Sequence, residues 1–236
     1  MTRETFEREL LRLQDEVLFL GSMAEQAVQD AVTALRQMDR KSARAIRKGD
    51  QQINEKRYQI EHETLVAIAT QQPMARDLRL LAAILEIITE LERIGDYAKG
   101  IAGIVLMLDK EDVEIPKGDL KRMADLGMDM LHRALGAFLA RDADTARAIT
   151  PEDDKIDALY NKIYRKLLKQ MMADPSTVDN ATRMMWAAHN LERMGDRVTN
   201  ICERVVFVVT GEIKELDHTE DEVESPKDPQ TGQPTS

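Results

Sequence analysis

Apolar side chains recur every three or four residues along most of this chain, and polar or charged side chains occupy the positions between them. In two segments the steps alternate regularly between three and four. The apolar positions of these segments are Leu91, Ile94, Ala98, Ile101, Val105 and Leu108, and then Leu191, Met194, Val198, Ile201, Val205 and Val208. This period is typical of helices that pack in left-handed bundles. Aromatic residues make up only 4% of the chain and charged residues 32%, which also favours long helices over sheets.

The periodicity, together with caps and prolines, predicts six long helices. We expect them over residues 6–37, 40–71, 74–108, 118–140, 143–173 and 176–210. Asp39 and Asp142 are predicted N-caps, because a short carboxylate can accept hydrogen bonds from the free amides of the following turn. Pro73 and Pro175 mark the turns that precede the third helix of each half.

The chain contains an internal repeat. The segment LERIGD at 91–96 recurs as LERMGD at 191–196, and ARAI at 43–46 recurs at 146–149. Both matches occur in the same order and at nearly the same spacing, which indicates duplication of one structural unit. We therefore predict an all-α fold of two tandem three-helix bundles, a first repeat over 1–110 and a second over 117–211. The acidic segment 212–236 has few apolar residues and is predicted to be a disordered tail.

Each repeated motif places acidic side chains on one helical face. Glu92 and Asp96 are four residues apart, as are Glu192 and Asp196, and Asn200 continues the second series. Two like charges at this spacing destabilise a helix by roughly a few tenths of a kcal/mol unless a positive charge lies between them. The repetition of such a pair at equivalent positions predicts a binding site for a cation.

The neighbouring helix supplies further oxygen ligands to each predicted site. Counting equal distances from the turns near 72 and 174 places Asp50 opposite Glu92, and Asp153 and Asp157 opposite Glu192 and Asp196. An all-oxygen set of ligands suits Mg²⁺, Mn²⁺ or Ca²⁺, and carboxylate clusters also hold iron. The alternative is an acidic stripe in solvent, bridged by Arg93, Arg193 or Arg197.

Two stretches of the chain resemble the PhoU family of phosphate-signalling proteins. The first is QPMARDLR at 72–79 leading to LERIGDYA at 91–98, and the second is Asp174-Pro175 leading to LERMGDRVTNI at 191–201. The resemblance implies two three-helix bundles, a homodimer, and carboxylate-rich metal sites for iron, zinc, magnesium or manganese. It also implies a negative regulator of phosphate uptake and of the phosphate-starvation response. Its implied partners are the ATPase subunit of a phosphate ABC transporter and a sensor histidine kinase.

One position departs from the family pattern, which has asparagine four residues after the aspartate of each motif. The second repeat has Asn200 there, but the first has Gly100. We therefore expect weaker metal binding in the first repeat. An alternative function is a ferritin-like, carboxylate-bridged metal oxidase, which would carry Glu-x-x-His on its helices. Gly95 and Gly195 stand where that histidine would be, so we expect a binding protein rather than an enzyme.

The charge and hydropathy of the chain indicate its surroundings. The net charge is −10, of which −6 lies in residues 212–236, and this balance does not favour nucleic-acid binding. The charged N-terminal residues do not resemble a signal peptide, and no window approaches the roughly 18 apolar residues of a membrane span. A single cysteine, Cys202, excludes an intrachain disulfide. We expect a cytoplasmic protein that does not insert into a membrane.

Overall fold

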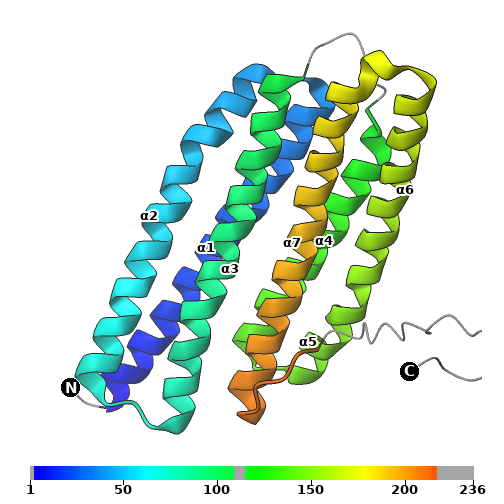
Figure 1. The fold of residues 1–236 in the computed structure, drawn as a ribbon. Coiled ribbons are helices and arrows are strands. Elements are labelled where there is room, and N and C mark those ends of the chain that lie inside the picture. Colours follow the sequence, from blue (N-terminus) through cyan, green and yellow to red (C-terminus); the bar gives the residue numbers. More distant parts are fainter. Residues whose placement is uncertain (1–2, 109–114, 217–236) are drawn as a thin grey trace, which may run out of the picture.

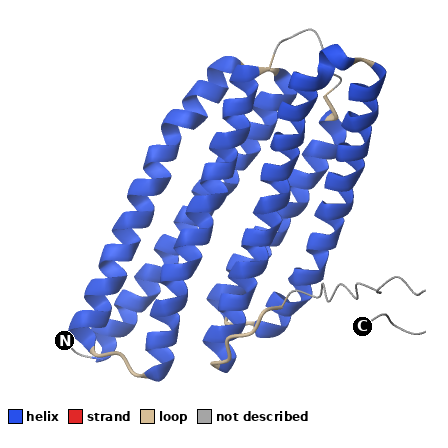
Figure 2. Cartoon of the chain, in the orientation of Figure 1, coloured by secondary structure: helices blue, strands red, loops and turns tan. Residues whose placement is uncertain are grey.

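A computed structural model describes residues 3–108 and 115–216, and every regular element in these ranges is helical (Figure 2). The first repeat consists of α1 (Arg3–Gln37), α2 (Arg40–Gln71) and α3 (Ala75–Met107). The second consists of α4 (Lys117–Ala140), α5 (Ala143–Ile149), η1 (Thr150–Glu152), α6 (Asp153–Ala173), η2 (Pro175–Thr177) and α7 (Val178–Thr210). The prediction of an all-α fold with two three-helix bundles is confirmed.

The two bundles pack side by side along their length (Figure 1). The last helices of the repeats, α3 and α7, lie against each other at the centre, and α1 contacts α4. Every residue of the two predicted apolar seams is at most 4% exposed. Gly21 permits the close contact of α1 with α4, because a side chain there would lie 2.3 Å from the Cδ1 of Leu135. The core is therefore continuous across both repeats.

The turn between the first two helices has the same construction in both repeats. Met38 and Arg141 adopt left-handed conformations, with φ of 55° and 54°, and the predicted caps follow them directly. Asp39 accepts hydrogen bonds from the amides of residues 41 and 42, at 2.9 and 3.1 Å. Asp142 accepts from the amides of residues 144 and 145, at 3.1 and 3.0 Å. Both predicted N-caps are confirmed.

The predicted continuous helix over 143–173 is wrong in one detail. It is divided by the 3-10 turn η1, which contains Pro151. A proline inside a helix has no amide hydrogen to donate, and its ring clashes with the preceding turn. A similar short turn, η2, follows Asp174, so α7 begins at Val178, two residues later than predicted.

Beyond α7 the structure describes the chain as far as Leu216, without a helix or strand. Of the predicted tail, residues 212–215 are exposed, and the Leu216 amide donates to Glu203 Oε1 of α7 at 3.0 Å. Leu216 also packs on the apolar core. The rest of the predicted tail, 217–236, lies outside the described residues.

Among the helices of the described ranges, none is long and apolar enough to cross a membrane.

Candidate metal centre

The four predicted acidic ligands of the second repeat lie at the contact between two of its helices. Asp153 and Asp157 lie on α6, and Glu192 and Asp196 lie on the facing side of α7. Burial raises the pKa of Glu192, and the nearby carboxylates of Asp196 and Asp157 raise it further. The helices approach closely because Gly195 has no side chain: a Cβ there would lie 2.0 Å from Asp153 Oδ1. These positions agree with the counts from the turn.

Two basic side chains of α7 contact these carboxylates. Arg193 Nη1 lies 2.8 Å from Asp196 Oδ2, and His189 Nδ1 lies 2.9 Å from Glu192 Oε2. Arg197 is more distant from Asp196, at 3.9 Å. The arginine bridge that we considered as an alternative is therefore present at Asp196. Arg193 lies on α7, the same helix as Asp196, so this bridge does not connect α7 to α6.

Asn200 contacts the other repeat instead of the acidic cluster. Its Nδ2 donates to Glu90 Oε2 of α3 at 3.3 Å, and Arg197 Nη1 lies 3.2 Å from the same oxygen. At the equivalent place in the first repeat, a side chain on Gly100 would lie 3.3 Å from the amide of Asn190. Gly100 thus provides room for Asn190 at the α3–α7 contact. The sequence alone did not reveal these contacts of Asn200 and Gly100 with the opposite repeat, because they depend on which helices meet between the repeats.

The first repeat arranges its acidic residues around a lysine. Lys99 Nζ on α3 donates to Asp50 Oδ2 of α2 at 2.7 Å and to Asp96 Oδ1 at 3.2 Å. Glu92 lies close by, and its pKa is raised by burial and by the carboxylates of Asp96 and Asp50. Gly95 again allows close packing, because a Cβ there would lie 2.9 Å from Ile53 Cδ1. Asp50, Glu92 and Asp96 are therefore neighbours, as predicted, but an ammonium group already bridges two of them.

The two sets of residues differ in their suitability for a metal ion. As the side chains stand within 3–108 and 115–216, no three acidic, histidine or cysteine side chains converge closely enough to hold one ion. The all-carboxylate chemistry of the second repeat fits a hard cation, and its donors come from two adjacent helices. The first repeat does not fit a metal in the same way, because Lys99 supplies the positive charge.

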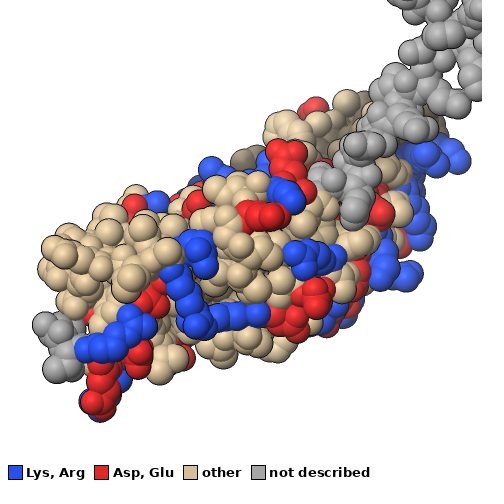
Figure 3. Space-filling model, turned by 90° about the horizontal axis from the view of Figure 1, so that it is seen from below, with Lys and Arg blue, Asp and Glu red and all other residues tan. Residues whose placement is uncertain are grey.

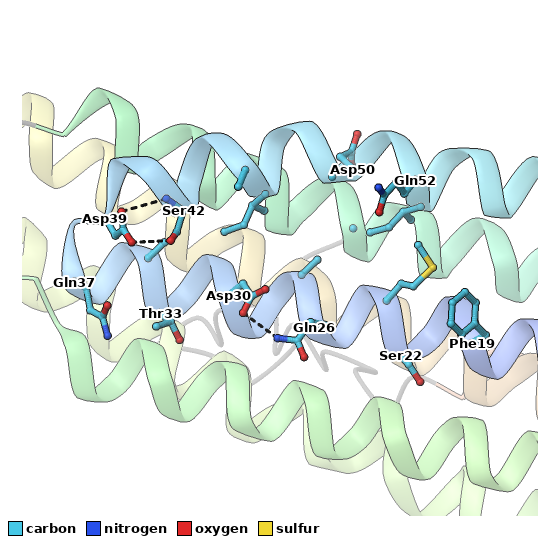
Figure 4. A pocket seen from close by; sticks show the side chains of 18 residues that line it. Phe19, Ser22, Gln26, Asp30, Thr33, Gln37, Asp39, Ser42, Asp50 and Gln52 are labelled. Atoms are coloured by element: carbon cyan, nitrogen blue, oxygen red, sulfur yellow. Dashed lines mark hydrogen bonds between the residues drawn. The ribbon is translucent and has the colours of Figure 1, made fainter.

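A groove runs along the first repeat between α1 and α2 (Figure 4). Its volume is about 650 Å³, and Asp50 and Gly95 are among the residues that line it. Gln26 and Asp30 of α1 are hydrogen-bonded to each other at 2.9 Å on the opposite wall.

On the end of the molecule shown in Figure 3, acidic and basic side chains lie next to one another. That end therefore does not present a single basic face for nucleic acid.

Cys202, the single cysteine of the chain, is fully buried, and burial raises the pKa of its thiol to about 12. Such a thiol remains protonated at neutral pH, and a protonated thiol is a poor nucleophile. This environment is that of a small apolar core residue.

Fold and site together define a class of all-helical protein that duplicates a three-helix unit and places an acidic motif on the last helix of each copy. The family model of the PhoU domain matches residues 17–105 and 120–205. A phosphate-specific transport system accessory protein PhoU homolog from Clostridium acetobutylicum is 36% identical over 217 residues, covering 92% of this chain and 99% of that protein. A homolog of the same description from Pseudomonas putida is 37% identical, covering 88% of this chain and 82% of that protein. The chain belongs to the PhoU family.

Solved structures agree with this assignment. The phosphate transport system regulatory protein PhoU from Streptococcus pneumoniae superposes with a TM-score of 0.83 at 32% identity, covering 89% of this chain and 99% of that one. PhoU from Pseudomonas aeruginosa gives the same TM-score at 34% identity, covering 88% and 100%. These matches support the prediction from the motif and give no support to the ferritin-like oxidase.

Proposed function

We propose that this protein is an accessory regulator of phosphate-specific transport and a negative regulator of the phosphate-starvation response. The observation that carries the proposal is the PhoU family match to both repeats, together with relatives of that description along nearly the whole described chain. Deletion of the gene is expected to leave phosphate-starvation genes active in phosphate-rich medium. Re-expression of the full chain should restore repression, and a deletion strain with a normal phosphate response would contradict the proposal.

The partners that we propose are the ATPase subunit of a phosphate ABC transporter and a sensor histidine kinase. This role requires a cytoplasmic protein that binds other proteins and does not itself catalyse a reaction, and we propose a homodimer as its form. Affinity purification of the tagged full chain should recover both partners. Recovery of neither from cells grown with abundant phosphate would argue against the adaptor role, even if the deletion phenotype were present.

We further propose that the second repeat binds a divalent or ferric ion through Glu192 and Asp196, with Asp153 or Asp157 from α6. The support is the crowding of carboxylates at the contact between α6 and α7, where burial and neighbouring charges raise the pKa of Glu192. A bound ion would neutralise this repulsion and would stabilise the folded state by mass action. Asn200 could join such a site only by leaving Glu90.

The paired change of Glu192→Gln and Asp196→Asn tests this site. It removes the charges but keeps the shape, so loss of bound metal and of the metal-dependent rise in Tm is expected. The matched control is Glu92→Gln with Asp96→Asn in the first repeat, which should have a smaller effect. Metal content and Tm that are unchanged in the second-repeat variant would refute the site, and a larger loss from the control would reverse the ranking of the repeats.

A further inference from the structure

The side chain of Lys99 joins two helices at the first acidic cluster. It extends from α3 to Asp50 of α2 at 2.7 Å while it also contacts Asp96 at 3.2 Å. Asp50 is only 6% exposed, and Asn54 donates a second hydrogen bond to the same carboxylate oxygen at 3.3 Å. The other oxygen of Asp50, Oδ1, is buried and has no hydrogen-bond partner. A largely buried carboxylate thus depends on one ammonium group for its neutralisation.

The second repeat does not have this lysine. The residue equivalent to Lys99 is Thr199, whose hydroxyl donates to the backbone carbonyl of Asp196 on its own helix at 2.8 Å. The short threonine side chain therefore turns back to α7 and brings no charge toward α6. The two acidic clusters share the repeated Glu-x-x-x-Asp pair and an aspartate on the neighbouring helix. They differ at the position three residues after the motif aspartate, which is lysine in the first repeat and threonine in the second.

We propose that Lys99 is a tethered cation that occupies the first-repeat cluster in place of a metal ion. The inference extends the proposed metal binding of the second repeat, and it assigns the difference between the repeats to Lys99 rather than to Gly100. Under this proposal the wild-type protein takes up metal in one repeat only. The first cluster is then a permanent link between α2 and α3 that does not respond to metal supply.

Electrostatic repulsion and competition explain why a metal ion would not bind to the first cluster while Lys99 is present. An ion that approached Asp50 and Asp96 would have to displace the ammonium group from both carboxylates or remain beside a like charge. Lys99 is attached to the same helix as Asp96, so it returns to the carboxylates without loss of translational freedom. The hydrogen bond to Asp50 also raises the pKa of Lys99, which keeps the side chain charged. Asp50 and Gly95 line the open groove between α1 and α2, which provides a route for a small ion when the lysine is removed.

The test is to replace Lys99 with the residue of the other repeat, Lys99→Thr, in the full chain. The metal-free protein is titrated with Mn²⁺, and binding is followed by loss of the electron paramagnetic resonance signal of the free ion. The expected result is one further Mn²⁺ per chain in Lys99→Thr compared with the wild type. Lys99→Arg, which keeps a positive charge, should gain none, and adding Asp50→Asn to Lys99→Thr should abolish the gain.

The same titration in the Glu192→Gln, Asp196→Asn background separates this inference from the proposed second-repeat site. If the second-repeat site does not exist, those two changes leave Mn²⁺ binding unaltered, and the gain from Lys99→Thr still reports on the first cluster. Lys99→Thr binding no more Mn²⁺ than its parent, or Lys99→Arg gaining as much, would overturn the inference. Should Lys99→Thr not fold without metal, recovery on refolding with Mn²⁺ but not with K⁺ supports it, and failure with both rejects it.

Discussion

Replacement of Gly195 by alanine is the sharpest test of the close contact between α6 and α7. The new methyl group would lie 2.0 Å from Asp153 Oδ1 and 3.2 Å from Ile156 Cδ1, so Asp153 must turn away and Ile156 must shift. Gly136 in α4 is the matched control, because a Cβ there meets nothing within 4 Å. Gly95 is intermediate, with Ile53 Cδ1 at 2.9 Å from the Cβ position.

Two opposing effects set the magnitude. Alanine in place of a glycine inside a helix stabilises by about 1 kcal/mol. Excess volume in a packed interior destabilises by about 1–3 kcal/mol, and this applies only where the methyl group has no room. We therefore expect Gly136→Ala to raise the free energy of unfolding by about 1 kcal/mol and Gly195→Ala to lower it by about 0–2 kcal/mol. Gly95→Ala should fall between them.

Urea unfolding of the metal-free proteins, followed by circular dichroism, measures the difference directly. In a chain of this size 1 kcal/mol corresponds to roughly 2–4 °C in Tm, so thermal melts should give the same order. If Gly195→Ala were as stable as Gly136→Ala, Asp153 would move aside at no cost. The contact with Gly195 would then not be what holds this carboxylate between the helices.

Four further predictions concern other parts of the molecule. Arg197→Met should lower the free energy of unfolding by about 1–3 kcal/mol, because it removes a cation from the largely buried carboxylate of Glu90. A double-mutant cycle with Glu90→Gln should show that the effects of the two substitutions are not additive. Cys202 should react with a thiol reagent at pH 8 only after unfolding, and rapid reaction of the native protein would contradict its burial. Hydrogen bonds from residues 145 and 144 lower the pKa of Asp142, so its stabilising effect is complete at neutral pH and is lost as the pH falls through that lowered pKa. The difference in unfolding free energy between wild type and Asp142→Ala should therefore shrink below about pH 4. A difference that stays constant with pH would count against the cap. Removal of 217–236 should leave Tm almost unchanged because the composition of the segment offers little apolar surface to bury, and a large fall in Tm would show that it binds the body.

The sequence by itself determined the features that depend on spacing along a helix or across one short turn. The alternation of steps of three and four predicted the apolar seams of α3 and α7. The short carboxylates of Asp39 and Asp142 predicted the caps of α2 and α5. Equal counts from a turn placed Asp50 opposite Glu92 and Asp157 opposite Glu192, because antiparallel helices joined by a short turn are in a fixed register. The prediction missed the break at Pro151, although the proline itself was the signal, and it missed the short turn η2 before α7.

Only the tertiary structure decided which neighbour each polar side chain contacts. Asn200 continues the face of Glu192 and Asp196 in sequence, yet it bonds to Glu90, more than a hundred residues away. Lys99 is one of several basic residues near the motif, but the rotation of α3 against α2 directs it to Asp50. Helical period and turn length fix which face a residue occupies. The rotation of packed helices, and the meeting of one repeat with the other, depend on all the core side chains together, and no local pattern records them.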